Sequence, residues 1–69
     1  MNFYAEIISK ALNVDMETAM AIQDFVNKWF DDVRWSSASE NQIIRIAKEA
    51  QAMMSDVRYI ELFDYKAGA

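Results

Sequence analysis

Apolar residues recur at alternating intervals of three and four along the second half of the chain, at Ile43, Ile46, Ala50, Met53, Val57 and Ile60. This spacing lines one face of a helix with apolar side chains. Neither Pro nor Gly interrupts the chain from Ser37 to Lys66. Ser37 and Glu40 are spaced as a capping box, in which each side chain accepts a hydrogen bond from the other residue's backbone N–H. The pattern therefore predicts one long helix over about 37–65.

Two shorter helices are predicted upstream, over about 3–13 and 15–32. Asn2 and Asp15 are suited to cap them, and Asn13 tolerates the left-handed conformation that ends a helix. We therefore expect an all-α fold of three helices forming a single domain over 1–69. The predicted core consists of Ile7, Leu12, Ile22, Val26, Trp29, Ile46, Ala50 and Met53.

The apolar residues near the C-terminus do not follow the apolar face of the predicted third helix. On a continuous helix, Tyr59, Leu62 and Phe63 would lie nearly opposite the stripe that begins at Ile43. Two interpretations are open. An unbroken helix would leave these side chains exposed, whereas a break near Ser55 and Asp56, with Asp56 capping a fourth short helix, would return them to the core.

The predicted helix lengths favour a homodimer. Thirty helical residues extend about 45 Å, and the helix over 15–32 covers only about 25 Å of that length. The uncovered part carries an apolar patch, and a second copy would bury it. The alternative break near Ser55, which folds the tail back onto the core, predicts a compact monomer instead. The predicted interaction residues are Val57, Tyr59, Ile60, Leu62 and Phe63, with Trp35 either in the core or an exposed contact for a partner.

The composition of the chain also favours association with another chain. A chain of 69 residues buries only about 60% of its unfolded surface, and this one has neither Cys nor His to add a disulfide or an imidazole metal ligand. Adjacent Asp31 and Asp32 are the best catalytic candidates, but neighbouring helical residues point about 100° apart. We expect no enzymatic activity, no metal and no cofactor.

Residues 8–22 fit the hydrophobic spacing of a helix-turn-helix, with Ser9 where a small apolar residue is usual. A DNA-associated regulator is therefore the alternative function. The second helix of this unit would present Asp15, Glu17 and Asp24 to DNA, and the whole chain has a net charge of −4. Because carboxylates repel phosphates, nucleic acid is an unfavoured partner. Glu17, Asp24 and Asp31 also recur every seven residues, which indicates a solvated polar face.

No apolar stretch is long enough to span a bilayer, and the N-terminal segment lacks a basic lead and an apolar signal core. We therefore expect no membrane partner and a cytoplasmic location.

Several short segments resemble small helical accessory proteins of phages and prophages. The resemblance covers about the first fifty residues and rests on Met1-Asn-Phe-Tyr4, Ala11-Leu-Asn-Val-Asp15 with Thr18-Ala19, Trp35-Ser36, and Ala47-Lys-Glu-Ala50. It implies an early or host-takeover factor of a phage, acting in the host cytoplasm on a host protein. Together with the apolar surface, it favours an acidic helical module for protein–protein interaction.

Overall fold

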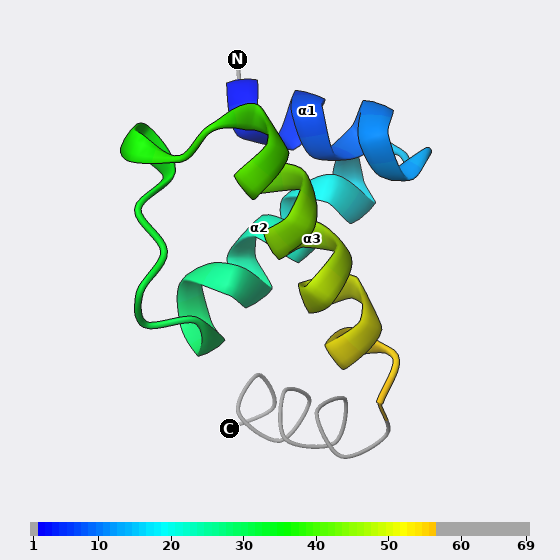
Figure 1. Cartoon of the computed structure of the whole chain (residues 1–69). Helices are drawn as coiled ribbons and strands as arrows, with labels where there is room; N and C mark the ends of the chain where they lie inside the picture. The colour runs from blue at the N-terminus through cyan, green and yellow to red at the C-terminus, as the bar shows by residue number, and fades with distance from the viewer. Residues whose placement is uncertain (1, 57–69) are drawn as a thin grey trace.

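A computed structural model describes residues 2–56 of the chain. Over that range the protein is all-α, with three α-helices and one turn of 3-10 helix (Figure 1). Helix α1 spans Phe3–Leu12, α2 spans Met16–Trp29 and α3 spans Glu40–Met54, while the 3-10 turn η1 spans Trp35–Ser37. Each helix packs against the other two. The predicted fold class is confirmed.

The starts of α1 and α2 are capped as predicted. The Asn2 side chain accepts a hydrogen bond from the Ala5 N–H, and Asp15 accepts one from the Thr18 N–H at 2.8 Å. Asn13 ends α1 in the left-handed conformation, with φ of 55° and ψ of 52°. These interactions satisfy backbone groups that a helix terminus leaves without a partner inside the helix.

Helix α2 ends at Trp29, three residues before the predicted end. The backbone of Phe30 is extended, and Asp31 and Asp32 form a turn. Phe30 and Val33 are thereby half-buried against the core. Asp31 and Asp32 favour a turn over a helix interior, because Asp side chains compete for nearby backbone groups.

The predicted start of the third helix is wrong by three residues. The capping box consists of Ser39 and Gln42: Ser39 accepts from the Gln42 N–H at 3.2 Å, and Gln42 accepts from the Ser39 N–H at 2.8 Å. Ser37 instead ends the 3-10 turn, where its hydroxyl donates to the Arg34 carbonyl. Gln at the third helical position closes the box as well as Glu does.

The predicted end of the third helix is also wrong, because α3 stops at Met54 and not at residue 65. The Ser55 hydroxyl donates to the Gln51 carbonyl, and the Asp56 N–H donates to the Met53 carbonyl. Short polar side chains compete for backbone groups in this way and favour helix ends. The helix therefore ends near Ser55 and Asp56, as the alternative interpretation predicted. The predicted return of Tyr59, Leu62 and Phe63 to the core lies outside the described residues. The proposed fourth helix lies outside the described residues.

The core differs in part from the predicted one. Ile22, Val26 and Ala50 are buried as expected, whereas Ile7, Leu12, Trp29, Ile46 and Met53 are half-buried and pack around it. The other buried residues are Ala5, Ile8, Ala19, Phe25, Ile43 and Ala47. Within residues 2–56, four of the nine buried residues are alanines, which contribute little to a hydrophobic pattern but fit between closely packed helix backbones.

Candidate functional site

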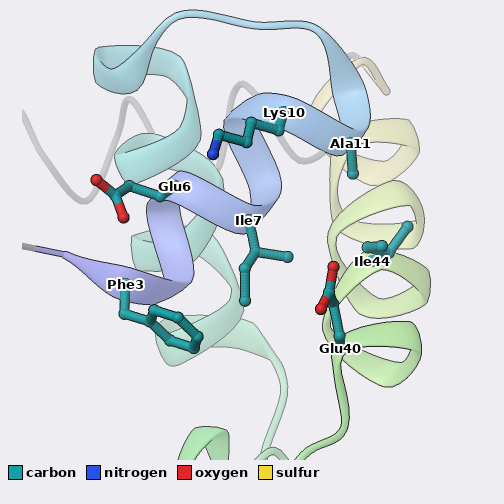
Figure 2. A pocket seen from close by; sticks show the side chains of 7 residues that line it. All are labelled: Phe3, Glu6, Ile7, Lys10, Ala11, Glu40 and Ile44. Carbon is teal, nitrogen blue, oxygen red and sulfur yellow. The ribbon is translucent and has the colours of Figure 1, made fainter.

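A groove runs between α1 and the first turns of α3 (Figure 2). It is a hollow of about 330 Å³. Its lining residues are Phe3, Glu6, Ile7, Lys10, Ala11, Glu40 and Ile44. Phe3 is 64% exposed, so its ring presents an apolar surface to solvent at the edge of the hollow.

Helical spacing explains why these side chains line the groove. Phe3, Ile7 and Ala11 are four residues apart on α1, and Glu40 and Ile44 are four apart on α3, so each set forms one row. Ala11 has the shortest side chain of its row, and it leaves space beside Ile44. Figure 2 shows Ile7 pointing toward α3, and Ile44 and Ala11 facing each other across the groove.

In each of two pairs of adjacent isoleucines, one side chain is buried in the core and the other lines the groove. Ile8 and Ile43 are buried, at 0% and 2% exposure, whereas Ile7 and Ile44 are half-buried and line the hollow. Neighbouring residues on a helix point about 100° apart, so the two members of a pair cannot both face the same core. The half-buried isoleucine of each pair, Ile7 on α1 and Ile44 on α3, therefore provides the apolar wall of the groove.

The groove carries more negative than positive charge. Glu6 and Lys10 extend from α1, and the Glu40 carboxylate points from α3 toward Ile7 (Figure 2). Glu6 and Glu40 lie in the first turns of their helices, where the helix dipole stabilises carboxylates. A complementary ligand would be apolar and would carry a cation near these two carboxylates.

Five of the six predicted interaction residues, Val57, Tyr59, Ile60, Leu62 and Phe63, lie outside the described residues. The sixth, Trp35, is half-buried in η1. Its indole N–H donates to the Asn27 side chain at 2.8 Å, and its ring packs on Tyr4 with ring centroids 5.5 Å apart. These contacts hold Trp35 on its own chain, and its contact with a partner stays a prediction.

The possible helix-turn-helix unit has a well-bonded turn. The Ser9 hydroxyl donates to the Val14 carbonyl at 2.6 Å, which accounts for a polar residue where a small apolar one was expected. On α2, Glu17, Met20 and Asp24 are exposed, and Met20 is 47% exposed. The accessible face of α2 near this turn is therefore acidic and apolar.

The Asp31 and Asp32 carboxylates are exposed in the turn after α2, outside any helix. The solvated polar face predicted from Glu17, Asp24 and Asp31 is interrupted there, because Glu17 and Asp24 lie on α2 and Asp31 does not. Within residues 2–56, His, Cys, Asp and Glu form no group of three that could hold a metal ion. Across that same range, every helix is too short or too polar to cross a membrane.

Sequence reasoning did not identify the groove. It placed Phe3 only at the start of a helix and did not place Ile44 at all. The adjacent isoleucines were the available signal, because one member of each pair had to lie off the core stripe. Comparison with protein families, curated proteins and solved structures found no match to this chain.

Proposed function

We propose that the protein is a non-enzymatic module for protein–protein interaction. The observation that carries the proposal is Phe3, a 64% exposed aromatic ring beside an apolar groove. Exposed apolar surface of this kind marks interaction sites on small proteins, and aromatic residues contribute strongly to binding. The chain also lacks the His and Cys residues on which much enzymatic chemistry depends.

The proposed assembly is a homodimer formed through Val57, Tyr59, Ile60, Leu62 and Phe63. The predicted length of the third helix does not support the dimer, because α3 ends at Met54. The homodimer is supported instead by the apolar character of these five residues, which follow a domain whose three helices enclose a core of nine buried residues within 2–56. Their apolar side chains add surface that a second copy can cover. Burial between two copies would also stabilise a small domain by mass action.

The resemblance to phage and prophage proteins suggests a second partner. It supports a role as an accessory factor, early or host-takeover, that binds a host protein in the host cytoplasm. The net charge of −4 favours a partner surface with basic residues.

The alternative function is a DNA-associated regulator using residues 8–22. The bonded turn between α1 and α2 favours it, and the acidic exposed face of α2 opposes it. A gel shift on mixed-sequence DNA at low salt separates the two functions, because low salt strengthens any electrostatic contact with phosphates. Retardation at micromolar protein would favour the DNA-associated regulator.

Light scattering coupled to size exclusion tests the dimer. The wild type should approach twice the monomer mass of 8.0 kDa as its concentration rises. Tyr59→Glu with Phe63→Glu should remain monomeric, because the interface would have to bury new carboxylates. Ala21→Glu with Ala52→Glu is the matched control, since it adds the same charge at two exposed helical positions. A wild-type mass of 8.0 kDa at high concentration would contradict the dimer.

A further inference from the structure

We propose that the groove between α1 and α3 binds the segment Val57–Phe63 of a second copy of this chain. This inference rests on the proposed homodimer and assigns its contact surface. The segment has the sequence Val-Arg-Tyr-Ile-Glu-Leu-Phe, with five apolar residues, one cation at Arg58 and one carboxylate at Glu61. Each copy would insert its segment into the groove of the other, so one two-fold axis would relate two identical contacts.

Apolar complementarity supports this occupant. The groove offers the Phe3 ring, the half-buried side chains of Ile7 and Ile44, and the open space above Ala11. Tyr59, Leu62 and Phe63 are large apolar side chains that can fill such a hollow. Phe3 has the largest exposed fraction among the large hydrophobic residues within 2–56. Filling the hollow would remove its ring from water, which is favourable.

Charge complementarity supports it as well. Glu6 and Glu40 contribute two carboxylates to the groove, and Lys10 contributes the single amine. Arg58 is the cation of the inserted segment and can pair with either carboxylate. Arginine presents several donors in a planar group and suits carboxylates at interfaces.

The point where the chain leaves α3 favours a second copy over the same copy. The groove lies at Glu40 and Ile44, whereas the chain leaves α3 at Met54, and the ten residues from Ile44 to Met54 span about 15 Å of helix. Asp56 remains beside the last turn, because its N–H donates to the Met53 carbonyl. From there, the three residues to Tyr59 extend at most about 11 Å. The first half of the segment therefore cannot enter the groove of its own chain, and a second copy has no such restriction.

The test introduces Ala11→Arg in the full chain and measures mass by light scattering over a range of concentrations. Ala11 is exposed in the last turn of α1, where a cation is favourable for the helix, so the fold should persist. The new side chain fills the hollow and repels Arg58, and we expect the dimer dissociation constant to rise at least about tenfold. Ala21→Arg, at an exposed position of α2, is the matched control and should dimerise like the wild type. Circular dichroism should show that both variants keep the wild-type helix content.

Mixing two defective proteins tests the exchange of segments directly. Ala11→Arg retains an intact segment, and the variant carrying Tyr59→Glu and Phe63→Glu retains an intact groove. Each should be monomeric alone, and the mixture should form a heterodimer through the one remaining groove and segment. Arg58→Glu should also weaken the wild-type dimer, and by less in 1 M salt, where the Debye length falls to about 3 Å.

The outcomes separate this inference from the homodimer itself. A dimer of Ala11→Arg as tight as the wild type, with a monomeric Tyr59→Glu/Phe63→Glu variant, would overturn the groove and leave the dimer through the C-terminal segments standing. A monomeric wild type would overturn both proposals, whether the groove covers a segment of its own chain or binds a foreign protein. Failure of the mixture to form heterodimers would overturn the exchange of segments.

Discussion

The indole N–H of Trp35 donates a 2.8 Å hydrogen bond to the side-chain oxygen of Asn27, eight residues earlier. The same indole ring packs on Tyr4 of α1, so one residue of the connection between α2 and α3 contacts both preceding helices. A second polar contact joins α1 to α2, where Asn2 donates to the Gln23 side chain at 2.7 Å. The connection is therefore fixed on the domain before α3 begins.

Replacing Asn27 by Ala should lower the free energy of unfolding by about 0.5–1.5 kcal/mol, the usual net contribution of one hydrogen bond. Trp35→Phe removes the same bond and keeps an aromatic ring to pack on Tyr4. Denaturant unfolding of the two single variants and the double variant forms a double-mutant cycle. If the two effects are simply additive, the bond between Trp35 and Asn27 contributes nothing to stability.

The start of α3 gives a second prediction with a built-in comparison. Ser39→Ala should cost about 1 kcal/mol of stability, because it leaves the Gln42 N–H without its cap. Ser37→Ala should cost much less, since the Ser37 hydroxyl makes one 3.3 Å bond at an exposed position. Denaturant midpoints of the two variants measure the difference. A larger loss for Ser37→Ala would place the cap at Ser37, as the sequence pattern indicated.

Local sequence predicted helix caps well where one candidate residue was available. At the two ends of α1 and at the start of α2, the sequence offers one suitable capping residue each. These residues are Asn2, Asn13 and Asp15, and all three cap their helices as predicted. Before α3, two overlapping patterns compete, one from Ser37 to Glu40 and one from Ser39 to Gln42. The contacts of Trp35 with Tyr4 and Asn27 belong to tertiary structure, and no local pattern reports them.

Predicting the groove from the sequence would also have required knowledge of how the helices pack against one another. Alternating spacings identify one apolar stripe per helix, and the remaining apolar residues have no assigned partner. Ile44 is one of these residues without an assigned partner, whereas its neighbour Ile43 belongs to the buried stripe. Which side of α1 faces the core decides whether Ile7 or Ile8 is buried, and the buried Ala5 lies three residues before Ile8 on the same face of the helix. Alanine carries too weak a hydrophobic signal to show this from sequence.

The register of the core can be tested with two isoleucines three residues apart on α3. Ile43 is 2% exposed, whereas Ile46 is half-buried. Ile43→Ala should therefore cost about 2–5 kcal/mol, as large-to-small changes in a core do. Ile46→Ala deletes the same atoms and should cost less, because solvent already reaches part of that side chain. Equal losses in denaturant unfolding would show that Ile46 is buried as deeply as Ile43, as the sequence pattern predicted.

Asp15 should make stability depend on pH in the acid range. Hydrogen bonds from the Thr18 side chain and the Thr18 backbone N–H lower the pKa of the Asp15 carboxyl below its ordinary value of 3.8. A carboxyl group with a lower pKa in the folded state binds protons more weakly there than in the unfolded chain. Its contribution to stability is therefore fully present above about pH 3.8 and is lost as the pH falls through the folded-state pKa.

Asp15→Asn separates this effect from general acid denaturation. Asn is also a good N-cap and accepts the Thr18 N–H, but it does not titrate. The wild type should have the higher thermal midpoint at pH 6, since the negative charge of Asp15 also interacts favourably with the start of α2. The difference between the two midpoints should shrink between pH 4 and pH 2, because protonation removes the charge only from the wild type. A difference that stays constant over this range would show that the folded-state pKa of Asp15 is not lowered.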